Sequence, residues 1–192
     1  MSKPQIFTAF DAASLAEAFP ATLRGEAIQA AERVLRHLHE RQWSDFFQVT
    51  VGVETVSIPY RLHFSSDLPS DGETGMIYLM EKCLEARSND GFQRQRAVQQ
   101  LLRDVQPWSA PFIMAVIGEY LIEILRDIND ALTPQASAAL ADFICANPRY
   151  WHLTRQRVVS YWDVYYRAQF GRSEYIGFKL LGTLAEAVRS RR

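Results

Sequence analysis

PFIMAVIGEYLIEIL, residues 111–125, is the most apolar stretch of this 192-residue chain. It is too short to span a bilayer, and Glu119 and Glu123 interrupt it, so we interpret it as a helix buried inside a folded protein. We expect this helix to occupy residues 109–132, with Pro111 in its first turn, where proline is tolerated.

The sequence on either side of this stretch is also helical in pattern. Apolar residues recur at steps of three and four, which places them on one stripe of each helix. Asp11 and Thr133 are suited to cap two of these helices. Helices are therefore predicted over residues 11–19, 25–42, 75–86, 92–105, 133–146 and 173–189. Their lengths favour a mainly α protein built from antiparallel helical pairs.

Residues 46–64, FFQVTVGVETVSIPYRLHF, have a different character. Branched and aromatic residues alternate with polar ones, which is typical of strands, and Gly52 lies at a suitable position for a turn. Pro59 cannot donate a backbone hydrogen bond, so its strand is expected at a sheet edge. We predict one small β-hairpin, packed on the helices because a hairpin is unstable by itself. Residues 65–75 read as a loop.

Composition favours one folded unit. Hydrophobic residues make up 48% of the chain and charged residues 22%, as in globular proteins with a proper core. We expect one domain over 1–192, with the first helices and the hairpin in 1–70 and a helical body in 75–192. Net charge is −1, but residues 149–192 hold nine Lys or Arg and only three Asp or Glu. This basic end meets either the acidic remainder of the chain or an acidic partner.

The motif Arg-Gln-Arg occurs twice, in FQRQRAV (92–98) and in LTRQRVV (153–159), and a Glu-Tyr pair follows each copy. The two segments, 90–132 and 149–190, resemble one unit of a HEAT-type helical array in length and helix pairing. A short HEAT-like stack is one interpretation, and chance similarity is the other. We expect an Arg of each motif to bond the Glu of the same segment.

Cofactor and catalytic motifs are missing from the sequence. It contains no HExxH, CxxC, GxSxG, GxGxxG or Walker-type phosphate loop, so we expect no cofactor and no metal. The two cysteines, Cys83 and Cys145, lie in apolar helical contexts and are expected to be buried free thiols. Few cysteines and no apolar core of signal-peptide type near the N-terminus favour a cytoplasmic location.

A small group of charged residues is the candidate for a pocket. Glu119 and Glu123 are four residues apart and would share a helix face, where paired carboxylates can bind a cation or exchange protons. Ion pairing with an Arg of either motif is the simpler interpretation. An enzyme or small-ligand binder would place Arg94, Glu119, Glu123 and Arg157 around one pocket between helices.

Residues 149–170, RYWHLTRQRVVSYWDVYYRAQF, are the most unusual part of the chain. Rings occur nearly all round the predicted helix, so one neighbour cannot bury them all. Either this helix is central and enclosed by others, or part of it faces a partner. Aromatic residues and arginines are enriched at protein interfaces, and they also stack on bases and neutralise phosphates.

The favoured interpretation is a non-catalytic binding or adaptor protein of the bacterial cytosol, with a protein partner or self-association. The residues expected to dock the partner are Arg155, Trp162, Tyr165, Tyr166 and Arg167. The alternatives are the enzyme or ligand binder described above and a nucleic-acid-associated protein that uses the basic C-terminal third. Near-zero net charge weakens the nucleic-acid alternative, and no membrane partner is expected.

Overall fold

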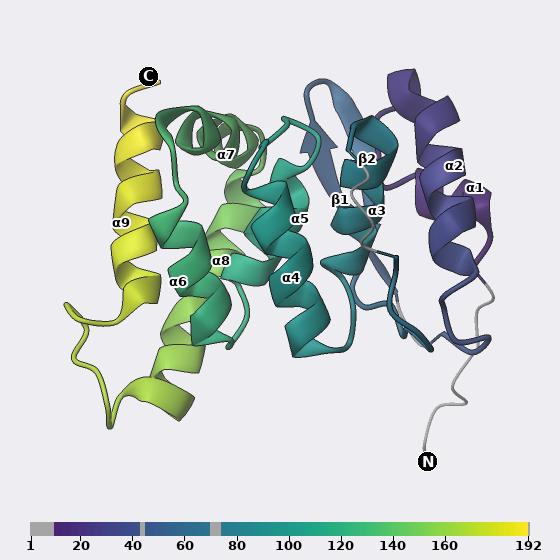
Figure 1. The fold of residues 1–192 in the computed structure, drawn as a ribbon. Coiled ribbons are helices and arrows are strands. Elements are labelled where there is room, and N and C mark those ends of the chain that lie inside the picture. Colours follow the sequence, from purple (N-terminus) through teal and green to yellow (C-terminus); the bar gives the residue numbers. More distant parts are fainter. Residues whose placement is uncertain (1–9, 43–44, 70–73, 192) are drawn as a thin grey trace, which may run out of the picture.

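The computed structural model describes residues 10–42, 45–69 and 74–191, and within these ranges the chain is mainly helical with one two-stranded antiparallel sheet, as predicted. The chain progresses across the molecule from α1 and α2 at one end to α9 at the other (Figure 1). They are α1 (Ala12–Ala16), the 3₁₀ turn Ala21–Leu23, α2 (Arg24–Leu35), β1 (Phe46–Val51), β2 (Glu54–Pro59), α3 (Met76–Glu85), α4 (Gly91–Leu101), α5 (Ala110–Ile117), α6 (Ile122–Asp130), α7 (Pro134–Ala146), α8 (Pro148–Tyr161), the π-helical turn Trp162–Tyr166 and α9 (Ile176–Arg189).

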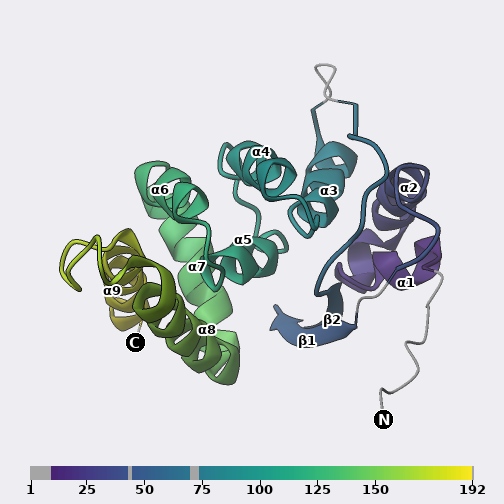
Figure 2. The ribbon, with the colours of Figure 1, turned by 90° about the horizontal axis from the view of Figure 1, so that it is seen from below.

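The predicted hairpin is present, and its register runs from Phe46 opposite Pro59 to Val51 opposite Glu54. Gly52 turns the chain with a φ of 61°, which glycine adopts without strain. Hydrophobic side chains from both strands are buried, so the hairpin packs on the helical body as expected. The hairpin and α8 lie on the same side of the molecule (Figure 2).

Asn147, between α7 and α8, forms hydrogen bonds with the outer edge of β1. Its side-chain amide accepts a hydrogen bond from the Thr50 N–H at 2.7 Å and donates to the Thr50 carbonyl at 2.8 Å. The same amide also donates to the Phe143 carbonyl at 2.9 Å. One buried side chain therefore joins the hairpin to the C-terminal helices.

The core is centred on α5, and every residue of that helix is buried. Buried hydrophobic residues form one cluster that extends from Leu15 in α1 to Leu184 in α9. The stretch at 111–125 is thus buried as predicted over its first half, but the prediction of one helix over 109–132 is wrong. The helix ends at Ile117, and α6 begins at Ile122, because the chain turns at Gly118 and carries Glu119 into contact with three arginines.

Several helix ends also differ from the predictions. α2 ends at Leu35 and not near residue 42, because the following backbone pairs with residues 63–65: His39 N–H donates to the His63 carbonyl at 2.8 Å. α9 begins at Ile176, after a turn in which the Glu174 carboxylate accepts from the Gly171 N–H at 2.9 Å. Asp11 and Thr133 cap α1 and α7 as predicted. Of the predicted loop 65–75, residues 70–73 lie outside the described ranges.

The cysteine prediction is half right. Both thiols are free, but Cys145 is exposed on α7 and only Cys83 is buried. Burial raises the pKa of the Cys83 thiol well above its usual value, so this thiol is unreactive at neutral pH.

Candidate functional site

The helix that carries the aromatic and arginine residues is not enclosed. Of the 14 residues of α8, Thr154 and Val158 are buried. The interpretation of this segment as a central helix surrounded by others is therefore wrong. After Tyr161 the chain continues as the π-helical turn, so that the rings of residues 161–166 point in more directions than one α-helical face allows.

Trp162 lies toward α9 and is half-buried. Its indole N–H donates to the Phe170 carbonyl at 2.9 Å, and its ring packs edge-on against Phe178 with centroids 5.4 Å apart. The Arg172 guanidinium lies 5.5 Å from the Trp162 ring centroid and 5.3 Å from that of Phe178. Cation–π attraction to the two rings favours this position of the cation.

Tyr165 and Tyr166 make different contacts from Trp162. The Tyr166 hydroxyl donates to the Tyr120 carbonyl at 2.5 Å, and its ring stacks on Tyr175. Tyr165 is 54% exposed and contacts the rings of Tyr120 and Tyr161. The predicted docking residues therefore form two groups, with Arg155 and Trp162 on the α9 side and the two tyrosines beside Tyr120, where Tyr166 also reaches Tyr175 at the start of α9.

Arg167 is exposed beyond both groups. It pairs with Asp163 one turn earlier, at 2.8 Å, and both side chains are more than half exposed.

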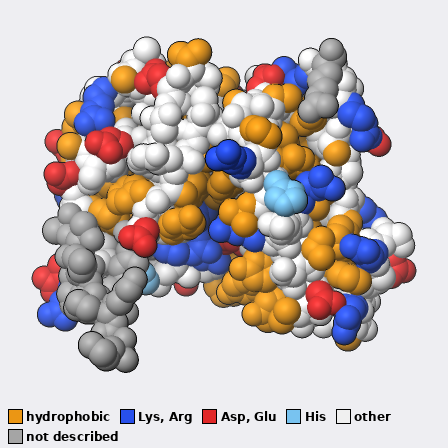
Figure 3. All heavy atoms as spheres, turned by 180° about the vertical axis from the view of Figure 1, so that it is seen from behind, with side chains coloured by type: hydrophobic (Ala, Val, Ile, Leu, Met, Phe, Trp, Pro, Cys, Tyr) orange, Lys and Arg blue, Asp and Glu red, His pale blue; other side chains and the backbone are white. Residues whose placement is uncertain are grey.

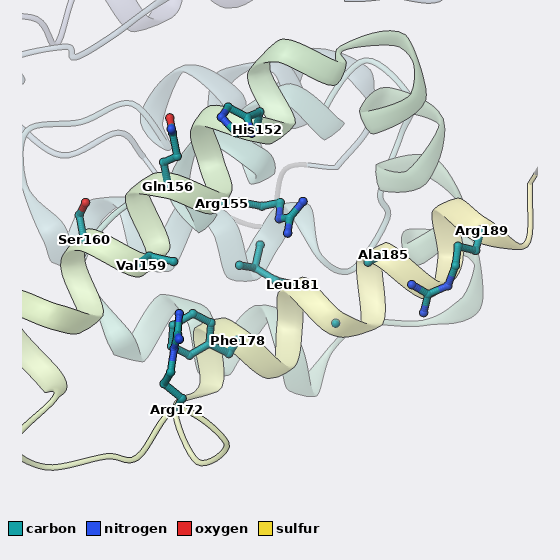
Figure 4. A pocket seen from close by; sticks show the side chains of 11 residues that line it. His152, Arg155, Gln156, Val159, Ser160, Arg172, Phe178, Leu181, Ala185 and Arg189 are labelled. Carbon is teal, nitrogen blue, oxygen red and sulfur yellow. The ribbon is translucent and has the colours of Figure 1, made fainter.

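An open groove of about 980 Å³ lies between α8 and α9 (Figure 4). Figure 4 shows α8 and α9 running in opposite directions along it, with Arg155 and Val159 of α8 and Leu181 of α9 pointing into the space between them. Its lining consists of hydrophobic and small side chains, here called the floor, and of basic and polar ones. The lining residues are His152, Arg155, Gln156, Val159, Ser160, Arg172, Phe178, Leu181, Gly182, Ala185 and Arg189.

The lining of this groove is basic, with three arginines and one histidine and no Asp or Glu. In the described part of the chain, no carboxylate forms an ion pair with Arg155 or Arg172. Arg189 lies 3.8 Å from Glu186, but both side chains are largely exposed, so water screens that contact. Basic side chains also stand among hydrophobic ones on the half of the molecule that carries α8 (Figure 3).

Glu119 is the centre of a second, more buried cluster. Its Oε1 lies 2.7 Å from an Arg61 nitrogen and 3.1 Å from one of Arg87, and its Oε2 lies 3.0 Å from Nε of Arg94. The Arg94 N–H does not point at the oxygen, so this last contact is an ion pair without a hydrogen bond. The expected pairing of the first Arg-Gln-Arg motif with Glu119 is thus present. In the second segment, residues 149–190, the Glu174 carboxylate instead accepts a hydrogen bond from the Gly171 N–H.

A cavity of about 220 Å³ lies beside this cluster. Of the four residues predicted to line one pocket, Glu119 and Arg157 do so, whereas Arg94 reaches Glu119 from outside the lining. Glu123 is exposed on α6, next to a different cavity, because the break at residues 118–121 separates it from Glu119. Glu119 and Glu123 are therefore not a paired carboxylate site.

The sequence did not identify several residues that line the groove and the cavity. Arg61 and Arg87 lie far from Glu119 in sequence and carry no motif. Phe178, Leu181 and Ala185 recur at helical spacing on α9, and this spacing predicts an apolar face of the helix. Arg172 lies in a turn between two helices, and only the fold brings it over Trp162.

Within residues 10–42, 45–69 and 74–191, no group of three His, Cys, Asp or Glu side chains is arranged to hold a metal ion. None of the helices described for this chain has the length and apolar character needed to cross a membrane. Comparisons with protein-family models, curated proteins and solved structures found no match.

Proposed function

We propose that this protein is a non-catalytic binding or adaptor protein that docks an acidic amphipathic helix of a partner protein in the groove between α8 and α9. The observation that carries this proposal is the composition of the groove. Three arginines and a histidine surround a hydrophobic floor, and no carboxylate lines it. An occupant that matches both features has an apolar face and acidic flanks.

The shape of the groove supports a helical occupant. Its walls are helices of 14 residues each, which corresponds to about 21 Å of length. A partner helix of about four turns has that length and places residues at steps of three and four along its apolar face. Val159, Phe178 and Leu181 would meet this face, while Arg155 and Arg172 meet its acidic flanks.

The rings beneath Arg172 support a binding role. A cation held over Trp162 and Phe178 loses little freedom when it bonds a carboxylate, and preorganised contacts of this kind favour affinity. Arginine and aromatic residues are also the types most often found at energetic hot spots of interfaces. Of the predicted docking residues, Arg155 and Trp162 take part in this proposed docking, whereas Tyr165, Tyr166 and Arg167 do not.

The test uses a designed helical peptide of about four turns, with Leu on one face and Glu on the others. A matched peptide carries Lys in place of every Glu. We expect fluorescence anisotropy to show that the protein binds the acidic peptide and not the basic one. The double substitution Arg155→Glu/Arg172→Glu should weaken binding about tenfold or more, because it replaces attraction by repulsion.

Two controls separate the groove from general charge effects. Arg103→Glu/Arg126→Glu changes the net charge equally on exposed positions elsewhere and should leave the affinity unchanged. Val159→Asp should abolish binding by placing a charge on the apolar floor. Equal binding of both peptides, or tighter binding of a single-stranded oligonucleotide, would overturn the proposal. Dimerisation of the wild type that Val159→Asp prevents, measured by sedimentation, would replace the partner by a second copy.

A further inference from the structure

The cavity beside Glu119 lies where the hairpin, α8 and the turn between α5 and α6 meet. It has a volume of about 220 Å³ and is separate from the groove between α8 and α9. Aromatic side chains from the hairpin and α8 form its walls, and three arginines and one glutamate reach it. Its lining residues are Phe47, Tyr60, Arg61, Arg87, Ala115, Gly118, Glu119, Tyr150, Arg157 and Tyr161.

Positive charge exceeds negative charge around this cavity. The side chains of Arg87 and Arg94 are only 4% and 3% exposed, and both depend on the single carboxylate of Glu119. Arg87 also donates to the backbone carbonyls of Pro59 and Tyr60, but carbonyls bring no negative charge. Buried cations are stable only when they are neutralised, so one carboxylate leaves this cluster short of an anion.

Arg157 adds a further cation from α8. Its stem packs against Gly118, where an added Cβ would come within 3.4 Å of the Arg157 Cδ. In the described part of the chain, no side-chain carboxylate forms an ion pair with Arg157. Its guanidinium is thus held at the cavity by packing and retains its donors for a ligand.

We infer that this cavity binds a small oxyanion, the carboxylate or phosphate group of a compact molecule, with the Arg157 guanidinium and the Tyr150 hydroxyl as donors. Arginine suits this role because its planar fork matches two oxygens of a carboxylate or phosphate. The Tyr150 side chain lines the same cavity as Arg87, Arg157 and Glu119.

The titration behaviour of neighbouring groups agrees with this inference. Burial lowers the pKa of Arg87 and the positive charge of Arg61 lowers it further, while the attraction of Glu119 opposes both effects in part. Burial raises the pKa of Tyr150 to about 12, and the hydroxyl therefore keeps its proton at neutral pH. A neutral phenol can donate to an anion, whereas a phenolate would repel it.

The size of the cavity limits the ligand. A volume of about 220 Å³ corresponds to roughly seven water molecules at about 30 Å³ each. Inorganic phosphate and a short dicarboxylate are small enough to fit.

The test measures thermal unfolding of the full chain in sodium phosphate, sodium succinate and sodium chloride at matched ionic strength. A ligand that binds only the folded state raises Tm with its concentration. We expect phosphate, succinate or both to raise Tm well above chloride, and the arm that responds identifies the oxyanion. Arg157→Gln should weaken the apparent affinity at least about tenfold, because it removes the charged fork.

Matched variants show whether the effect comes from this cavity. Arg103→Gln, the same substitution at an exposed site, should respond as the wild type does. Arg155→Glu/Arg172→Glu should also retain the response, because those residues line the other groove. If Arg157→Gln fails to fold, Tyr150→Phe provides the second test and should reduce the affinity several-fold.

Three results would overturn the inference: no rise above chloride, an unchanged rise in the folded Arg157→Gln or Tyr150→Phe variant, or loss of the rise in Arg155→Glu/Arg172→Glu.

Discussion

Replacing Glu119 by Gln tests whether one carboxylate joins three distant segments of the chain. Glu119 binds Arg61 after β2, Arg87 after α3 and Arg94 of α4, at 2.7, 3.1 and 3.0 Å. Glutamine keeps one acceptor oxygen, but it removes the charge and points an amide N–H₂ at a cation. Breaking a buried ion pair by removing one partner costs about 3–5 kcal/mol, because the other charge stays buried. That is a large part of the roughly 5–15 kcal/mol that stabilises a typical domain.

Urea unfolding followed by circular dichroism measures this loss. With an m-value near 2 kcal/mol/M, about 4 kcal/mol lowers the unfolding midpoint by about 2 M. Asp163→Asn is the matched control, because its pair with Arg167 is largely exposed and contributes about 0–0.5 kcal/mol. We expect only the control to have an unfolding midpoint within about 0.5 M of the wild type. If the midpoint of Glu119→Gln also lies within that range, Glu119 does not join the three segments.

Four further substitutions have expected outcomes. Tyr175→Phe removes a buried hydroxyl without a hydrogen-bond partner in the described residues, so it should be neutral or stabilise by up to about 1 kcal/mol in urea unfolding. Because burial raises the pKa of Tyr175 from 10.0 to about 12, the native protein loses stability as pH rises from 10.0 to about 12, and the variant should lose less over the same interval. Asn147→Ala should cost about 2–3 kcal/mol, measured the same way, because it leaves the Thr50 backbone groups without partners. Gly177→Ala should lower Tm, since its Cβ would lie 2.5 Å from the Tyr175 ring, whereas Gly182→Ala meets no atom within 4 Å and should raise Tm.

The fold class follows from local patterns, and the sequence therefore predicts it well. Apolar spacing predicts the helices, alternation and Gly52 predict the hairpin, and Asp11 and Thr133 mark two helix starts. The errors occur where distant contacts override local preference. Residues 109–132 have a continuous helical pattern, but the chain breaks at Gly118 because the buried Glu119 is bound by arginines from three other segments.

The candidate sites depend more strongly on such distant contacts. The sequence identifies Arg155, Trp162, Glu119 and Arg157, because each lies in an unusual local cluster. It does not show that the π-helical turn sends Trp162 toward α9 and Tyr165 toward Tyr120. Arg61, Arg87 and Arg172 look like ordinary surface arginines until the fold brings them to their partners.

The contact between Asn147 and Thr50 also bears on how this protein avoids aggregation. The strand β1, FFQVTV, is hydrophobic and β-branched and carries no charge, proline or glycine, as do segments that assemble into fibrils. A side-chain amide that both donates to and accepts from the Thr50 backbone takes the place of an adjoining strand. While the C-terminal helices are folded, this side chain prevents other polypeptides from pairing with the edge of β1. Partial unfolding of those helices would expose the edge to intermolecular β-pairing.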